Sequence, residues 1–203
     1  MNTRYIKSLL FIVVLLGIVA SCGKGSKEER IDELMDRSEE AKTNNHYDNA
    51  FDYHQAMVGL QTEIAIQMLD LQSKEQLEVA RNTIITNLSA LESLSFSGMD
   101  YGLKSSATDL FLFYLKIVED DFPEMFDLIN EIEANPTDEE FGMMAYTRLL
   151  EIQTNIEEEE QELSKAMDIS EAEFTRMHNM QLTENPLQDD IDSVIENDVY
   201  LDY

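Results

Sequence analysis

Five polar side chains interrupt the apolar stripes of the predicted helices and are best placed to do chemistry. His54 and Gln61 are seven residues apart, as are Tyr114 and Asp121, and this spacing puts each pair on one helix face. Glu159 interrupts the stripe of the fourth predicted helix. At about 1.5 Å of rise per residue, His54, Tyr114 and Glu159 fall within roughly 5 Å in height when counted from one end of a bundle. Such a layer is either a buried hydrogen-bond network or part of a small-ligand or metal site.

The stretch Met177-His178-Asn179-Met180 is a second candidate for metal binding. Thioether and imidazole groups suit Cu(I), but two methionines three apart on a helix also suit core packing. The candidate metal ligands are therefore His54, Glu159 and His178. The acidic run from Glu157 to Glu160 is interpreted as a solvated face, which a divalent cation could bind loosely.

The motifs of several enzyme and cofactor classes are absent from the sequence. None of the three histidines has a Glu three residues before it, as the Glu-x-x-His ligands of di-iron bundles require. No Asp-x-Asp-x-Asp-Gly loop, Gly-rich phosphate loop or Gly-x-Ser-x-Gly sequence occurs. The sequence therefore predicts a protein that is not an enzyme and uses no cofactor.

Four segments carry apolar residues at helical spacing and would position these side chains. They cover 45–72, 73 to the Ser97-Gly98 stop, 101–134, and 137 onward. Ser-x-x-Gln from Ser73 and Thr-x-x-Glu from Thr137 are capping boxes. Pro123 predicts a kink in the third helix, because the apolar period continues on both sides of it. Asp168-Ile169-Ser170 is a candidate break in the fourth.

Short links between helices favour antiparallel neighbours, so the fold class is all-α and the predicted architecture is an up-down-up-down four-helix bundle at 45–182. Residues 22–44 are charged and are interpreted as a lipid-anchored tether or stalk. Residues 183–203 contain seven acids and no base, which is typical of a disordered acidic tail.

Acidic residues outnumber basic ones by 42 to 14, and the formal net charge is −28. Such a surface repels phosphate backbones, so we expect no nucleic-acid partner. A basic or cationic partner would be attracted to it. The other reading of this charge is a solvated surface that keeps the protein soluble.

The only cysteine, Cys22, follows an apolar run that is preceded by Arg4 and Lys7. Residues 8–20 are too few to span a bilayer but have the length of a signal-peptide core, so 1–21 is predicted to be a signal peptide. Val19-Ala20-Ser21-Cys22 resembles the bacterial lipobox. The resemblance implies that Cys22 becomes the first residue and carries covalent lipid. The alternative is an uncleaved anchor helix with an incidental cysteine.

Three further stretches resemble an uncharacterised family of predicted bacterial surface lipoproteins of the Bacteroidetes and spirochaete type. They are Asp52-Tyr53-His54 through Gln61, Tyr114-Leu115-Lys116, and Phe174-Thr175-Arg176-Met177-His178-Asn179, within a match of about 45–182. His54 and Thr175 depart from the family pattern. The resemblance implies a location and a helical fold without an activity, and it adds interest to Gln61, Tyr114 and His178.

The sequence thus predicts a lipid-anchored protein of the bacterial cell envelope, at the outer membrane or the cell surface. Its expected role is non-enzymatic binding or scaffolding, with the membrane contacted through the anchor and the protein partner unknown. The alternative is a bundle that binds a metal or small ligand through His54, Tyr114 and Glu159.

Overall fold

The computed structural model describes residues 27–69, 71 and 73–181. The predicted signal peptide, Cys22 and the acidic tail from 183 lie outside the described residues. The elements in chain order are α2 (Lys27–Ala41), β1 (His46–Tyr47), α3 (Ala50–Leu69), α4 (Lys74–Ser93), β2 (Ser95–Phe96), α5 (Leu103–Lys116), the π-helical segment η2 (Ile117–Asp121), α6 (Phe122–Ala134) and α7 (Glu139–Met177). The prediction of an all-α protein is confirmed.

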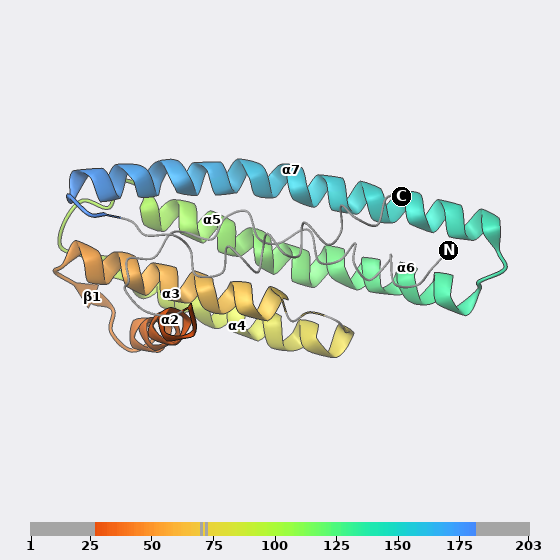
Figure 1. The fold of residues 1–203 in the computed structure, drawn as a ribbon, viewed down its shortest axis with the longest axis horizontal. Coiled ribbons are helices and arrows are strands. Elements are labelled where there is room, and N and C mark those ends of the chain that lie inside the picture. The colour runs from red at the N-terminus through yellow and green to blue at the C-terminus, as the bar shows by residue number, and fades with distance from the viewer. Residues whose placement is uncertain (1–26, 70, 72, 182–203) are drawn as a thin grey trace.

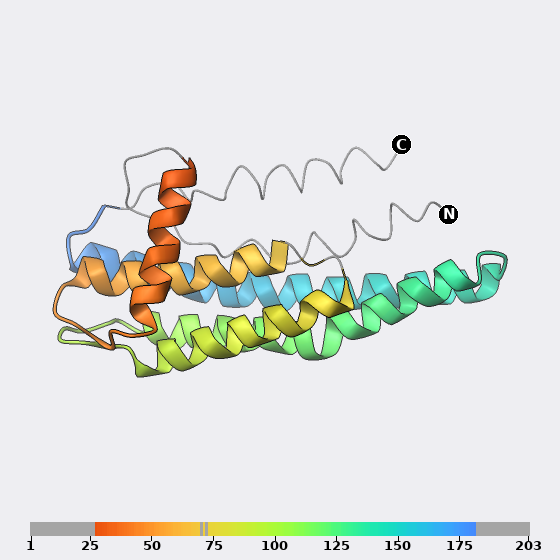
Figure 2. The same cartoon turned by 90° about the horizontal axis from the view of Figure 1, so that it is seen from below.

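The long helices lie side by side, and each reverses the direction of the one before it (Figure 1). α3 and α4 form one hairpin, while α5, η2 and α6 together run alongside α7. The second hairpin is longer, so α6 and the first part of α7 extend beyond the end of α3 and α4 (Figures 1 and 2). At the other end, β1 and β2 pair in parallel, with His46 opposite Ser95 and Tyr47 opposite Phe96. This pairing joins the loop before α3 to the loop after α4.

The starts of α4 and α7 agree with the predicted helix starts to within two residues, but neither Ser73 nor Thr137 makes the predicted capping hydrogen bond. Ser73 precedes α4 in an extended conformation. The N-cap of α7 is Asp138, one residue after Thr137, and its carboxylate accepts a 3.0 Å hydrogen bond from the backbone N–H of Phe141. A carboxylate at this position also interacts favourably with the positive end of the helix dipole.

The third predicted helix is continuous but changes its hydrogen-bond pattern just before Pro123. Residues 117–121 form a π-helical turn, in which the N–H of Phe122 bonds to the carbonyl of Ile117. Pro123 then occupies the first turn of α6, where its missing N–H costs little. The π turn thus absorbs the proline without ending the rod. α7 runs for 39 residues without a break at the candidate site 168–170.

Residues 27–41, part of the predicted stalk, instead form α2, a helix packed on the body. The side chains of Leu34, Ser38 and Ala41 are each no more than 1% exposed. α2 crosses α3 steeply, and its N-terminal end projects from the flank of the rod (Figure 2). The stalk interpretation rested on the high charge of this segment, but three small or apolar residues at helical spacing are enough to dock it.

The close crossing of α2 and α3 depends on Gly59. A Cβ atom at this position would lie 2.6 Å from the carbonyl oxygen of Leu34 and 2.7 Å from the backbone nitrogen of Ser38. Both are backbone atoms, which cannot move aside as a flexible side chain can. A residue without a side chain is therefore required for the two helices to approach this closely.

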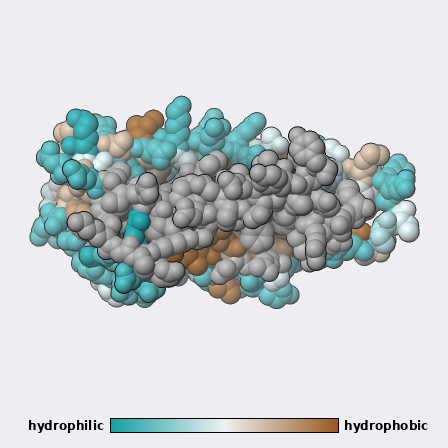
Figure 3. All heavy atoms as spheres, in the orientation of Figure 1, coloured by the Kyte–Doolittle hydropathy of each residue, from teal (hydrophilic) through white to brown (hydrophobic). Residues whose placement is uncertain are grey.

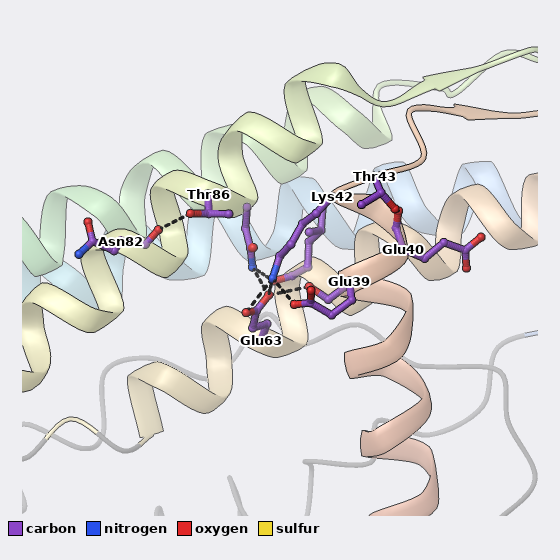
Figure 4. Close-up of polar contacts among 10 residues, drawn as sticks. Glu39, Glu40, Lys42, Thr43, Glu63, Asn82 and Thr86 are labelled. Carbon is purple, nitrogen blue, oxygen red and sulfur yellow. Dashed lines mark hydrogen bonds and ion pairs between the residues drawn. The ribbon is translucent and has the colours of Figure 1, made fainter.

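A half-buried carboxylate, Glu63, joins α2, α3 and α4. It accepts hydrogen bonds from the Ser38 hydroxyl (2.6 Å), the Lys42 ammonium (2.9 Å) and the Asn87 amide (3.0 Å). Lys42 and Glu63 point toward one another in the space between the helices (Figure 4). Burial alone would raise the pKa of Glu63, but these three donors outweigh burial and lower it below its usual value. Glu63 therefore stays ionised and holds the three helices together.

We predict that Gly59→Ala lowers the free energy of unfolding by about 1–3 kcal/mol, because the added methyl group forces the two backbones apart. Gly142→Ala is the matched control: this helical glycine has nothing within 4 Å of its Cβ position. The control should leave stability unchanged or raise it by up to about 1 kcal/mol. Urea denaturation followed by circular dichroism measures both, and equal effects of the two substitutions would contradict the close crossing.

Candidate functional site

The structure buries three of the five predicted site residues and leaves the other two at or near the surface. His54, Gln61 and Tyr114 are no more than 2% exposed. Asp121 is half-buried in η2, and burial raises the pKa of its carboxyl. The Glu159 side chain is 45% exposed. The expected layer of His54, Tyr114 and Glu159 is therefore not formed.

His54 bonds to a carboxylate that the sequence analysis did not select. Its Nε2 lies 2.6 Å from Oε1 of Glu171 on α7, and both side chains are more than 90% buried. The amide of Gln55 lies 3.4 Å from the other ring nitrogen, Nδ1. An amide N–H donates, so this contact favours the tautomer in which Nε2–H donates to Glu171. The imidazole also stacks on Phe174, with ring centroids 6.2 Å apart and an interplanar angle of 13°.

Tyr114 also bonds to a carboxyl that the sequence analysis did not select. Its hydroxyl donates to Oε1 of Glu160 over 3.2 Å, between α5 and α7. Glu160 is 1% exposed. Burial raises the pKa of Glu160 to about 8, although the Tyr114 hydrogen bond opposes this shift. Burial likewise raises the pKa of Tyr114, so the pair is neutral at pH 7.

The buried glutamate is Glu160 and not the predicted Glu159. The difference arises from the number of residues between successive inward positions of the helix. The inner face of α7 advances by four from Ile156 to Glu160 and again to Ser164. A step of three from Ile156 leads through Glu159 to the apolar Leu163, and this spacing predicts Glu159 on the inner face instead. Leu163 is only half-buried, whereas Ser164 is 5% exposed. Glu159 therefore points outward, where it forms an ion pair with Lys116.

Four buried polar residues of α7 are not among the predicted site residues: Glu160, Ser164, Glu171 and Thr175. Continuing the apolar period from Ile156 in steps of four and three would have found them. Polar identity concealed them, because a stripe is traced through its apolar members. The two carboxyls are eleven residues apart, or about 16 Å along the helix. His54 and Tyr114 therefore belong to two separate contacts and not to one layer.

The predicted metal ligands do not converge. Among the described residues, no group of three or more histidine, cysteine, aspartate and glutamate side chains is arranged to hold a metal ion. His178 donates one hydrogen bond from Nε2–H to the carbonyl oxygen of Met99, 3.0 Å away. Its ring packs on those of Phe174 and Phe96, with ring centroids 4.5 Å and 5.3 Å apart, respectively. This environment is a packed aromatic cluster at the β1–β2 end of the rod.

The coloured part of the surface is mostly hydrophilic, with smaller apolar areas (Figure 3). Adjacent methionines near the start of α7, Met143 and Met144, are 70% and 66% exposed. Across residues 27–69, 71 and 73–181, none of the helices combines the length and the apolar character needed to cross a bilayer.

Comparison with known proteins adds no relative. No family model, curated protein or solved structure matches this chain.

We predict that Glu160→Gln removes a pH dependence of stability. The carboxyl binds its proton more tightly in the folded than in the unfolded protein, so stability falls as the pH rises from about 4.5 to about 8. Glutamine keeps the shape and the acceptor for Tyr114 without a charge. The variant should match the parent near pH 5 and exceed it at pH 8.5 by a few kcal/mol.

Glu159→Gln is the control for this prediction, because it changes an exposed ion pair on the neighbouring residue and should shift stability by less than about 1 kcal/mol. Urea denaturation at several pH values compares the variants. If Glu160→Gln and the parent lose stability in parallel as pH rises, Glu160 is not the buried group that titrates.

We also predict that Glu171→Ala lowers the free energy of unfolding by about 3 kcal/mol, because it leaves His54 buried without its carboxylate partner. Glu173→Ala is the control, since Glu173 is exposed and lies 3.8 Å from Arg176. The double variant His54→Ala, Glu171→Ala should cost less than the sum of the single changes. Additive effects would show that the two side chains do not interact.

Proposed function

We propose that this chain is a lipid-anchored helical protein of the bacterial cell envelope, with a non-enzymatic binding or scaffolding role at the outer membrane or the cell surface. The observation that carries the proposal is the sequence Val19-Ala20-Ser21-Cys22 after an apolar run of signal-peptide length. Two or more acyl chains on Cys22 supply stable membrane attachment, at about 0.8 kcal/mol for each buried methylene group.

The body has features that fit a binding role. We infer that α3, α4, α5–α6 and α7 constitute the predicted up-down-up-down four-helix bundle, on the strength of their alternating directions (Figure 1). Its interior carboxyls bond to interior partners, as in Glu160 with Tyr114 and Glu171 with His54. Such groups are engaged in holding the fold and are not aimed at a substrate.

The surface supplies the means of contact. A net charge of −28 favours a basic or cationic partner. Exposed Met143 and Met144 lie near the start of α7. The start of α7 runs beyond the α3–α4 hairpin (Figure 1). Methionine is flexible and polarisable and is common at adaptable protein-binding surfaces. A rigid rod with an acidic surface and an apolar contact near its tip is suited to scaffolding.

The alternative, a metal or small ligand held by His54, Tyr114 and Glu159, has lost its geometric basis. His54 and Tyr114 are bonded to different carboxyls about 16 Å apart on α7, and Glu159 faces outward. Native mass spectrometry with elemental analysis of the purified protein tests it directly. A stoichiometric metal or ligand that is lost in His54→Ala would replace the scaffolding proposal.

We predict that Cys22→Ala prevents lipid attachment and signal cleavage, so the protein is released from the membrane fraction or retains its leader. Mass spectrometry and membrane fractionation measure the two effects, and the parent protein should carry the mass of the acyl chains. Ser21→Ala is the control, because alanine also fits the small-residue position before the cysteine. A Cys22→Ala protein with unchanged mass and fractionation would defeat the anchor.

A further inference from the structure

The docking of α2 restricts how far the folded body can lie from the anchor. α2 begins at Lys27, only five residues after Cys22. A fully extended chain covers at most about 3.6 Å per residue, so these five steps reach about 18 Å. A flexible stalk from 22 to 44 would instead reach about 79 Å. The packed helix therefore shortens the available tether more than fourfold.

α2 is held to the body at several points along its length. Leu34, Ser38 and Ala41 are buried against α3, and Ile31 is packed against the core one turn earlier. Lys42, directly after the helix, bonds to Glu63, which also binds Ser38. The Gly59 crossing removes the gap between the two backbones. A helix fixed in these ways moves with the body as one unit and does not act as a hinge.

The direction of α2 selects one flank of the body. The helix crosses the long axis of the rod, and its N-terminal end projects from the side of α3 that is opposite to α5 (Figure 2). In Figure 1 the same helix is seen almost end-on, with the rod lying across the view. α2 therefore begins at the flank of the rod and not at either tip.

We propose that the flank from which α2 projects faces the lipid bilayer, and that α2 is a rigid strut that holds the rod alongside the membrane surface. This inference rests on the proposed lipidation of Cys22. The body is about two helix layers thick, so α5 lies roughly 10–20 Å farther from the bilayer than α3. The α5 side and the protruding α6–α7 end remain open to a partner in the surrounding solution.

Energy transfer to labelled lipid tests this orientation on the full lipidated chain. Cys22 is acylated, so a cysteine introduced at an exposed position is the one free thiol available for a donor dye. Glu33→Cys puts the dye on α2, and Leu112→Cys puts it on α5, where the native side chain is 50% exposed. The vesicles are phosphatidylcholine with an acceptor on a fraction of the headgroups. Transfer from position 33 should exceed that from position 112 several-fold.

A linker variant separates a fixed orientation from mere proximity to the bilayer. Fifteen Gly and Ser residues inserted between Ser26 and Lys27 add a flexible segment with an r.m.s. length of about 22 Å, without changing the body. The insertion should abolish most of the difference between the two dye positions. Circular dichroism of each variant checks that the body remains folded, and both substituted positions are exposed.

The outcomes distinguish this inference from the function on which it rests. Vesicle-bound protein with equal transfer from both positions, or with more from position 112, overturns the strut and leaves lipid anchoring in place. A difference that survives the linker insertion also overturns it, because α2 would then not be what sets the orientation. Protein that lacks the acyl mass and does not bind vesicles defeats the proposed function, and the orientation with it.

Discussion

A carboxyl group buried between helices destabilises the fold unless it is neutralised or accepts hydrogen bonds. Among the described residues, Glu63, Glu160 and Glu171 are such groups, and each is satisfied in a different way. Glu63 stays ionised among the donors Ser38, Lys42 and Asn87. Glu160 remains protonated beside Tyr114, with a pKa raised to about 8. Glu171 bonds to His54 over 2.6 Å.

These contacts specify how the helices align along one another. Glu171 can meet His54, and Glu160 can meet Tyr114, only when α3 and α5 have one longitudinal position against α7. Apolar side chains alone would tolerate a slip of one turn with modest loss, whereas a slip would leave a buried carboxyl without its partner. Glu63 on α3 likewise fixes the positions of α2 and α4 along α3, through its bonds to Ser38 and Asn87. The polar interior therefore fixes the register, and the apolar core supplies most of the stabilisation.

The same arrangement bears on function. Histidine, tyrosine and glutamate in a bundle core suggest a ligand site when they are read from the sequence, but here their polar atoms bond to one another in pairs. The features that remain available to a partner lie on the outside: the negative charge, and the exposed methionines near the start of α7. The docked α2 also limits how the body can be oriented at a membrane, because it holds the body within a short distance of Cys22, the residue that would carry the lipid.

The helical class follows from local pattern. Leu77, Ile84 and Leu91 on α4 recur every seven residues, as do Leu103, Leu110 and Ile117 on the third predicted helix, and this spacing is typical of one helix face. The sequence also identified His54, Gln61 and Tyr114 as interior residues. A local pattern is enough for these features, because the helical period and the position of a residue within an apolar stripe can both be read from a short stretch of chain.

The partners of these residues depend instead on how the helices pack against one another. Steps of three and of four residues are both compatible with a helix, so the inward position after Ile156 depends on the side chains that α3 and α5 place opposite it. Tyr114 hydrogen-bonds to Glu160, whereas Glu159 forms an ion pair with Lys116 on the surface. The charged segment 27–41 became a packed helix because Gly59, distant in sequence, lets its backbone approach. Pairing and close approach are set between elements far apart in the chain, and no local pattern encodes them.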